Sequence, residues 1–330
     1  MVRALHGAAR VPSGHPPYDT LHFRLHYPAR WTGSDAERLT GVLPADTGGA
    51  PWPLAIVLPG INVGADGYRW LACTLASAGV ATATFDLVEE VMPGTFALSP
   101  GLDITAVMPD AYGTRPSATA LQPLVDAVRA LCTTGPTAGL VDCDRVLLVG
   151  HSAGGTVALE NTSDEWFPWL RGVVTYGAHT MPAVALGHPQ GTVLPMPGAL
   201  PALLVAGTDD GVIRSSADRY RAGEQHDPVR RTFLEGCPHP ASRLAVLSGA
   251  NHMVMVDNGD TTTARGFLDG TPTADSIRRD GEVRCLMAGM ITAFARAVLS
   301  NDRFAGTGAV DTSEVDTFAT HSGIESWEAK

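Results

Sequence analysis

Three residues of this chain have the types and the order that nucleophilic acyl chemistry needs: Ser152, an aspartate at 209 or 210, and His252. A serine hydroxyl is a poor nucleophile at neutral pH and needs a base to take its proton. Histidine can accept that proton and later return it, and a carboxylate fixes the imidazole tautomer. Each of the three follows a short apolar run, so we expect strands to carry them to one edge of a sheet.

Ser152 lies in the run GHSAGG at residues 150–155, which matches the pattern Gly-x-Ser-x-Gly. An apolar run at 146–149 precedes it and a helix-compatible run at 156–160 follows, which is the strand, turn and helix of a nucleophile elbow. The helix N-terminus behind such a turn favours developing negative charge. The alternative is a chance match in a chain with 36 glycines, and the flanking strand and helix disfavour it.

The acid and the base each have competitors. We favour Asp210, three residues after Gly207, over Asp209, which we expect to cap the next helix or to bond within the turn. We favour His252 as the base because it directly follows an apolar run at 243–247 and a short turn. The other histidines considered for this role are His151, His179, His226 and His239. His151 is expected to line the pocket, and His179 to lie either in the pocket wall or at the surface.

An acyl transition state also develops an oxyanion, which needs two preorganised N–H donors. The residue after the nucleophile supplies one, so we expect it from Ala153. The second is expected from the loop after the apolar run at 54–58, most simply from Ile61.

Two further side chains are candidates for the substrate pocket, Asn62 beside the oxyanion loop and Glu89 just past a predicted strand. Glu89 and its neighbour Glu90 could bind a cationic or hydroxylated group, or could be solvated or paired with an arginine. No metal and no organic cofactor is predicted. The turn at 257–260 only faintly suggests a calcium loop, because it lacks the later glutamate of a calcium hand.

Apolar periodicity predicts an α/β fold with a mostly parallel central sheet flanked by helices. A stretch at 18–28 alternates apolar and polar residues, which predicts an antiparallel strand with His22 and His26 on a solvated face. Continuous apolar runs suit strands buried on both faces. The further predicted strands are 54–58, 80–86, 146–149, 172–176, 202–206 and 243–247, and the predicted helices are 68–77, 118–132, 156–160, 215–222 and 283–299.

The remaining segments are predicted to be irregular. We expect an N-terminal arm at 1–17 and a partly mobile tail at 301–330. Three Gly- and Pro-rich or polar stretches at 87–117, 177–200 and 253–279 are long for loops of a compact domain, and loops of that length are commonly functional. We therefore expect a single domain over 1–330 with loop insertions over the active site.

Composition narrows the classes of partner. The net charge of −11 and the sequence pI near 5.4 disfavour nucleic acid and anionic membranes as partners. No apolar run approaches transmembrane length and the first ten residues lack a signal-peptide core, so a cytoplasmic protein is expected. The five cysteines lack metal-site spacing, and reduced thiols are expected, with a Cys237–Cys285 disulfide as the alternative in an exported protein.

The oxyanion-loop run LPGIN at 58–62, the run YRWLA at 68–72, GHSAGG at 150–155, GTDD at 207–210 and GANH at 249–252 together resemble the α/β-hydrolase superfamily. Within it the chain looks like the group of cutinase-like polyesterases, dienelactone hydrolases, chlorophyllases and platelet-activating-factor acetylhydrolase-like enzymes, over roughly residues 54–300. The resemblance implies Ile61 and Ala153 as oxyanion donors and Asp210 as the acid. Ile61 stands where the polyesterases carry an aromatic residue, and the long loops favour a smaller, enclosed ester over a polymer.

Three hypotheses follow for function. The favoured one is a serine hydrolase that cleaves a carboxylic ester, lactone or thioester through an acyl-enzyme. The second gives the same triad to a thioesterase, acyltransferase or cyclase of a biosynthetic pathway, because the long loops could exclude water. The third is a ligand-binding protein without catalysis, which the presence of all three triad residue types disfavours.

Overall fold

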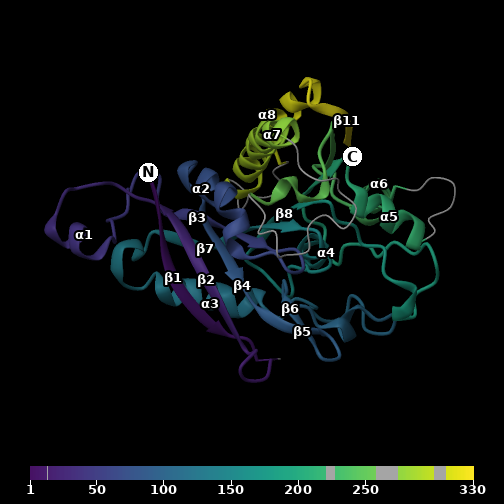
Figure 1. Cartoon of the computed structure of the whole chain (residues 1–330), viewed down its shortest axis with the longest axis horizontal. Coiled ribbons are helices and arrows are strands. Elements are labelled where there is room, and N and C mark those ends of the chain that lie inside the picture. The colour runs from purple at the N-terminus through teal and green to yellow at the C-terminus, as the bar shows by residue number, and fades with distance from the viewer. Residues whose placement is uncertain (13, 221–226, 258–273, 301–309) are drawn as a thin grey trace.

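The computed structural model describes residues 1–12, 14–220, 227–257, 274–300 and 310–330 (Figure 1). Within them, nine strands form one sheet in the order β1-β2-β4-β3-β7-β8-β9-β10-β11. Neighbours from β4 to β10 pair in parallel, whereas β1 with β2, β2 with β4 and β10 with β11 are antiparallel. The predicted α/β class with a mostly parallel central sheet is confirmed. The strands are β1 (Val2–Arg10), β2 (Thr20–Pro28), β3 (Trp52–Leu58), β4 (Ala81–Asp86), β7 (Val141–His151), β8 (Leu170–Tyr176), β9 (Ala202–Gly207), β10 (Arg243–Leu247) and β11 (Ile324–Ala329).

Helices cover both faces of this sheet, because the side chains of a strand alternate between its two faces. Leu54 and Ile56 of β3 join the core that contains the helices α3 and α4, whereas Ala55 and Val57 join the core that contains α2 and α7. The helices are α1 (Asp35–Thr40), α2 (Arg69–Ser77), α3 (Leu121–Leu131), α4 (Ala153–Leu159), α5 (Gly211–Tyr220), α6 (Pro228–Arg231), α7 (Ala274–Leu299) and α8 (Ser313–Asp316). Five predicted helices correspond to α2, α3, α4, α5 and α7, and α7 begins earlier than expected.

Both ends of the chain belong to the sheet, which corrects the predicted N-terminal arm and the predicted tail. β1 pairs with β2 from Val2 opposite Pro28 to Arg10 opposite Thr20. β11 pairs with β10 from Arg243 opposite Ala329, so it forms the far edge of the sheet. Neither end carries a long apolar run. β1 is held by ladder hydrogen bonds to the next strand along the chain, and β11 by those to β10, about 80 residues earlier. Periodicity within the segment does not reveal such pairing.

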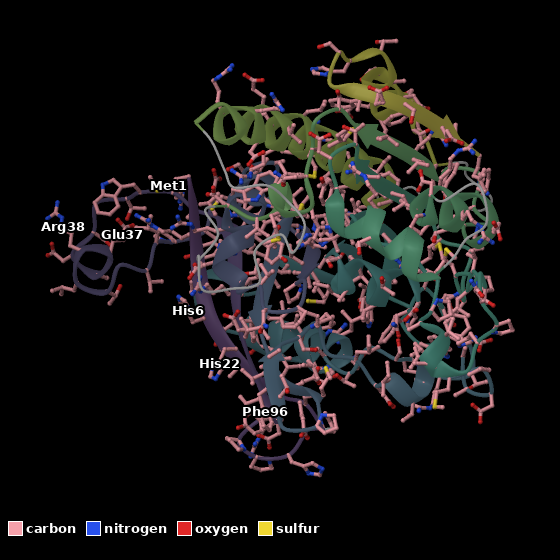
Figure 2. The ribbon with its side chains drawn as sticks, turned by 45° about the vertical axis from the view of Figure 1, so that its right-hand side comes forward. Met1, His6, His22, Glu37, Arg38 and Phe96 are labelled. Atoms are coloured by element: carbon pink, nitrogen blue, oxygen red, sulfur yellow. The ribbon has the colours of Figure 1, made fainter. Side chains whose placement is uncertain are left out.

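The structure of β2 also corrects the prediction for one of its two histidines. His22 lies opposite Ala8 and is exposed, as predicted, and Figure 2 shows it with His6 on the outer part of this ribbon. His26 is instead buried, because β4 lies on the other side of β2 and Nδ1 of His26 is 3.3 Å from the Thr82 carbonyl oxygen. Burial lowers the pKa of His26.

The three long stretches differ in structure. Residues 87–117 contain the hairpin β5 (Val88–Met92) and β6 (Thr95–Leu98) and a 3₁₀ turn at Ile104–Val107, so this stretch is not wholly irregular. Residues 177–200 are irregular except for a 3₁₀ turn at Val184–Leu186, as expected. Residues 258–273 of the third stretch lie outside the described residues. Figure 2 shows Phe96 at the hairpin, where its ring stacks on Tyr18 at 4.2 Å between centroids.

Candidate active site

Ser152 occupies the junction between β7 and α4. β7 ends at His151 and α4 begins at Ala153, so the serine is the single residue between strand and helix. Its backbone has φ 53° and ψ −123°. A positive φ in a residue other than glycine costs of order 1–3 kcal/mol and persists only where the surroundings enforce it. The strand–turn–helix predicted for this motif is therefore present, with the strain that exposes the serine side chain.

Gly154 shows why only small residues fit behind this turn. A Cβ on Gly154 would clash with the backbone carbonyl of Leu58 at the end of β3. Backbone atoms cannot yield as a flexible side chain can, so a larger residue would push α4 away from β3. The packing brings the loop that follows Leu58 beside the elbow, since a Cβ on Gly60 would lie 3.3 Å from Cβ of Ser152.

Asp210 and His252 meet although they lie 42 residues apart in the chain. Nδ1 of His252 is 2.8 Å from Oδ2 of Asp210, and both side chains are almost fully buried, with relative exposures of 6% and 2%. The other Asp210 oxygen accepts the Ile213 N–H at 2.8 Å, in the first turn of α5. Because carboxylate oxygens only accept, Nδ1 of His252 donates its hydrogen and Nε2 is left free to act as a base.

Asp209, the competing acid, is exposed and accepts from the Thr208 hydroxyl at 3.2 Å. The structure thus brings Asp210 to the histidine, as predicted. Of the two roles expected for the other aspartate, Asp209 has the bond within the turn, whereas the first turn of α5 is bonded by Asp210 itself. Among the competing histidines, His239 accepts the Ala241 N–H in a separate turn, and His226 lies outside the described residues.

His151 does not line the cavity that contains Ser152, contrary to expectation. It is buried, and its Nε2 lies 3.0 Å from the carbonyl oxygen of His252 while Nδ1 lies 2.9 Å from the Tyr68 hydroxyl. A carbonyl only accepts, so Nε2 donates to it and Nδ1 accepts from Tyr68. Burial, together with the nearby His252, lowers the pKa of His151 to about 3 and keeps the ring neutral. His151 therefore ties the backbone of His252 to the elbow.

The predicted oxyanion donors belong to the two segments that adjoin Ser152, the start of α4 and the loop after β3. Ala153 opens α4, where the first N–H groups of a helix have no intrahelical acceptor. Ile61 follows Gly60, whose N–H donates to the Tyr68 hydroxyl at 2.9 Å. Tyr68 thus connects the loop of Ile61 to His151 in the elbow. The side chain of Ile61 itself is exposed, so only its backbone is available for the predicted role.

A cavity of about 290 Å³ opens at Ser152. Ser152, Ala153 and His252 line it at one end, and His179 and Glu160 also contribute to its wall. The apolar part of the wall comes from α4, from α5 and from two of the long stretches, with residues Leu102, Ile104, Val107, Val157, Met181, Leu186, Val212 and Ile213. These two stretches are joined where Nε2 of His188 lies 2.7 Å from the Val107 carbonyl oxygen. Segments from 87–117 and 177–200 therefore do form the walls around Ser152.

The predicted pocket residues have different outcomes. His179 lies in the cavity wall, where burial lowers its pKa to about 4, and its Nδ1 accepts the Met181 N–H at 3.2 Å. Asn62 and Glu89 do not line the cavity. Asn62, with φ 58°, holds Leu98 through both its N–H and its side-chain oxygen. The Glu89 carboxylate accepts from the Ser99 hydroxyl at 2.5 Å, so it bonds within the loop stretch.

Glu160 is the cavity residue that the sequence reasoning missed. It ends α4, is 6% exposed, and lies eight residues after Ser152. Burial raises its pKa to about 8. Its spacing was a usable signal, because positions i, i+4 and i+8 of a helix share one face. A glutamate eight residues past an elbow serine lies on the face of the helix that continues from the nucleophile.

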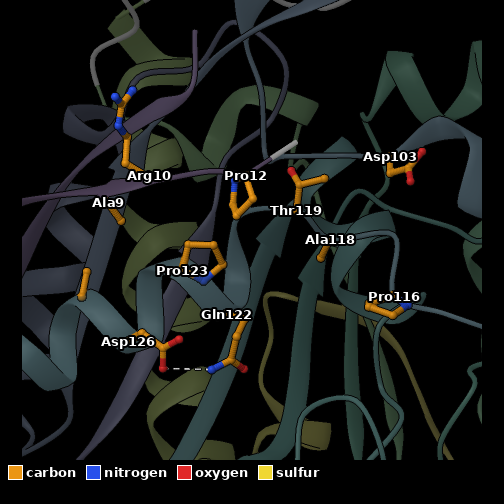
Figure 3. A pocket seen from close by; sticks show the side chains of 11 residues that line it. Ala9, Arg10, Pro12, Asp103, Pro116, Ala118, Thr119, Gln122, Pro123 and Asp126 are labelled. Carbon is orange, nitrogen blue, oxygen red and sulfur yellow. Dashed lines mark hydrogen bonds between the residues drawn. The ribbon is translucent and has the colours of Figure 1, made fainter. Parts of the chain in front are cut away.

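A second, larger hollow of about 660 Å³ lies elsewhere, between the end of β1 and the start of α3 (Figure 3). Its wall contains alanines, prolines, Asp103, Gln122 and Asp126. The charged groups already have partners, since Asp103 pairs with Arg115 at 2.5 Å and Gln122 donates to Asp126 at 3.0 Å. The residues that line this hollow include no serine, cysteine or histidine.

Comparison with known proteins finds no family model that matches this chain and no curated protein similar to it in sequence. Among the described residues, no helix has the length and apolar character to cross a membrane. Nor do His, Cys, Asp and Glu gather anywhere in that part of the chain in a group of three or more that could hold a metal ion. All five cysteines are free thiols, so Cys237 and Cys285 do not form a disulfide here.

Proposed function

We propose that this chain is an α/β-hydrolase that cleaves a carboxylic ester, lactone or thioester through a Ser152–His252–Asp210 triad. The observation that carries the proposal is the 2.8 Å contact between Asp210 and His252 at the wall of the cavity that Ser152 opens into. The strained backbone of Ser152 at a strand–helix junction supports the same assignment. The mostly parallel sheet, with its antiparallel N-terminal strands, is compatible with that fold.

In the proposed reaction, the Ser152 hydroxyl attacks the carbonyl carbon of the substrate while Nε2 of His252 takes its proton. The carbonyl oxygen becomes an oxyanion, which the N–H groups of Ile61 and Ala153 stabilise. His252 then gives the proton to the departing alcohol or thiol, which leaves an acyl group on Ser152. Water, deprotonated by His252, attacks this acyl group, and the carboxylic acid departs as Ser152 regains its proton. Asp210 holds the imidazole in the required tautomer and stabilises its charged form.

The size of the cavity favours small substrates. A volume of about 290 Å³ lies at the lower end of the range for small-molecule sites, about 300–1,000 Å³. The apolar wall suits the hydrocarbon part of an acyl group. We therefore propose a short- to medium-chain ester as the substrate rather than a polymer.

Hydrolysis of p-nitrophenyl butyrate by matched variants tests this function. We expect Ser152→Ala to lower kcat by about 10⁴-fold or more, and Asp210→Asn by roughly 10³–10⁴-fold, because the asparagine favours the wrong imidazole tautomer. Asp209→Asn is the control, since this neighbouring carboxylate is exposed and does not contact His252; its kcat should stay within a few-fold of the parent. Parent-like hydrolysis by folded Ser152→Ala would refute the proposal.

A further inference from the structure

Glu160 is a buried carboxyl that faces the cavity of Ser152 without a bonding partner in the described part of the chain. It lines the cavity and is 6% exposed. No hydrogen bond or ion pair joins the carboxyl of Glu160 to a described residue, whereas the carboxylates of Glu89, Asp103 and Asp210 all have such partners. A buried polar group without a partner costs free energy, and a buried charge costs more. Because no described residue satisfies this carboxyl, a hydrogen-bond donor on a molecule inside the cavity could do so.

The position of Glu160 fixes where such a group must lie. Ser152 directly precedes α4, Thr156 lies within it and Glu160 directly follows it, and all three line the cavity. At 1.5 Å per residue, the ends of this row are about 12 Å apart between Cα atoms. The Thr156 hydroxyl is already committed, since it donates to the His179 carbonyl at 2.8 Å. Glu160 is therefore the open hydrogen-bonding group at the end of the row remote from Ser152.

The rest of the wall narrows the class of ligand. Between the two ends the wall is apolar, with Val157, Met181 and Leu186 among its members, so it suits a hydrocarbon chain. The lining residues include neither lysine nor arginine, and an acyl chain that ends in a carboxylate would face Glu160 without a counter-charge. An ammonium or a hydroxyl, in contrast, can donate to the carboxyl.

We propose that Glu160 binds a hydrogen-bond donor, an ammonium or a hydroxyl, at the far end of the acyl chain that becomes attached to Ser152. This assignment rests on the proposed ester hydrolysis and names the substrate class of that site. The chain runs along α4, its carbonyl carbon at Ser152 and its terminal donor at the carboxyl of Glu160. Since burial raises the pKa of Glu160 to about 8, an ammonium would also draw the carboxyl into its ionised form and release a proton to solvent.

The test compares p-nitrophenyl esters whose acyl chains differ only at their end. Hexanoate, 6-aminohexanoate, 6-hydroxyhexanoate and the monoester of hexanedioate are matched, and acyl chains of about four to eight carbons vary how far the terminal group reaches along the helix, which rises about 1.5 Å per residue. At pH 7 and after subtraction of spontaneous hydrolysis, we expect kcat/KM of the amino or the hydroxy ester to exceed that of hexanoate by about tenfold or more. The hexanedioate monoester should be the poorest substrate.

Variants connect this preference to Glu160. Glu160→Leu should remove the preference for the amino and hydroxy esters over hexanoate. Glu160→Met makes the same test if the leucine variant does not fold. Glu160→Gln separates the two donors, because an amide still accepts from a hydroxyl but lacks the charge that an ammonium needs. Glu165→Leu is the control: Glu165 is exposed and does not line the cavity, so the ratio of the esters should not change.

Two results would overturn the proposal while leaving the hydrolase intact. One is a parent protein that hydrolyses all these esters through Ser152 without a preference for either donor; the other is a preference that persists in Glu160→Leu and Glu160→Met. Labelling by a fluorophosphonate distinguishes this failure from failure of the proposed function. A folded parent that neither takes up the label at Ser152 nor hydrolyses any ester would refute both.

Discussion

His151 and Glu160 are both buried titratable residues next to the candidate active site, and burial acts on them in opposite directions. It lowers the pKa of the His151 imidazole to about 3 and raises that of the Glu160 carboxyl to about 8, because in each case the charged form loses its hydration. His151 satisfies both ring nitrogens within the protein. The carboxyl of Glu160 has no such partner among the described residues. His151 therefore positions the site, whereas Glu160 can bind a ligand.

The raised pKa of Glu160 predicts how stability depends on pH. The folded protein keeps the carboxyl protonated up to about pH 8, whereas the unfolded chain releases the proton near its ordinary value of 4.5. The stability of the parent relative to Glu160→Gln should therefore be greatest below about pH 4.5 and fall as pH rises to about 8, by up to about 1.4 kcal/mol per pH unit.

Urea denaturation of the parent and of Glu160→Gln between pH 4 and pH 9 measures this difference. Glu165→Gln is the matched control, because this glutamate is exposed and does not line the cavity. A difference between the parent and Glu160→Gln that stays constant over this range would contradict the assigned burial of the carboxyl.

For single residues, the sequence predicts the roles of those that directly follow strands. It does not predict the roles of residues that depend on a partner far away in the chain. Ser152, Asp210 and His252 each come just after an apolar run, and parallel strands bring their carboxyl ends to one edge. The choice of Asp210 over Asp209 and the burial of His151 depend on contacts across 42 and 101 residues. Glu89 was misplaced because its carboxylate bonds Ser99 and Leu102 of its own loop stretch and Thr119 just beyond it, and no periodic signal marks these contacts.

Among the elements, the link from the oxyanion loop to the elbow runs through one residue. Tyr68 ends the 3₁₀ turn Ala65–Tyr68 before α2, accepts the Gly60 N–H and donates to His151. His151 ends β7 and bonds the backbone of His252, which begins the 3₁₀ turn His252–Met255 after β10. Three strand ends are thus held together by a short series of hydrogen bonds.

Tyr68→Phe should therefore affect catalysis as well as stability. It leaves the Gly60 N–H and Nδ1 of His151 without a partner, at a cost of about 1–3 kcal/mol each. We expect kcat for p-nitrophenyl butyrate to fall about tenfold, because the loop that carries Ile61 is no longer fixed beside Ser152.

Tyr27→Phe provides the matched control for this prediction. The Tyr27 hydroxyl is also buried and donates to the Leu43 carbonyl at 2.7 Å, but Tyr27 lies in β2, away from the residues of the cavity. The Tyr27→Phe variant should therefore be less stable than the parent without a comparable loss of kcat. Equal effects of the two variants on kcat would show that the Tyr68 link has no specific role.

Strands that consist of a continuous apolar run were predictable from the sequence, and strands at the edges of the sheet were not. The runs at 54–58, 146–149 and 202–206 correspond to β3, β7 and β9, because burial on both faces leaves a plain apolar signal. β1 and β11 each pair with a single neighbour and carry mixed side chains, so their own sequences resemble an arm and a tail. The β5–β6 hairpin was missed for the same reason, since most of its residues are exposed.

For the whole molecule, the C-terminal segment closes one edge of the sheet through Arg243. This arginine of β10 is 8% exposed, and it pairs with Asp316 at 2.7 Å and donates to the Thr312 hydroxyl at 2.6 Å. α8, which contains Asp316, packs on α7, and β11 follows it onto the edge. Residues 310–330 are thereby tied to the core by a buried guanidinium as well as by the ladder.

Arg243→Met should destabilise the fold by about 1.5–3 kcal/mol, because it removes the charged hydrogen bonds of a buried guanidinium to the partly exposed Asp316 carboxylate and to the Thr312 hydroxyl. Arg230→Met, which removes the pair between the exposed Arg230 and Glu328 near the same edge, should cost much less stability than Arg243→Met. Urea denaturation gives both free energies of unfolding. Similar losses in the two variants would contradict the role assigned to Arg243.

The central claim is that Ser152 is a nucleophile activated by His252 and Asp210, and covalent labelling tests it most directly. The intact mass of the folded protein, taken after reaction with a fluorophosphonate, should increase by one adduct, and peptide mapping should place the adduct on Ser152. Ser152→Ala should take up none, and Asp210→Asn should react much more slowly than Asp209→Asn. An adduct on another residue, or a folded parent that remains unlabelled, would contradict the claim.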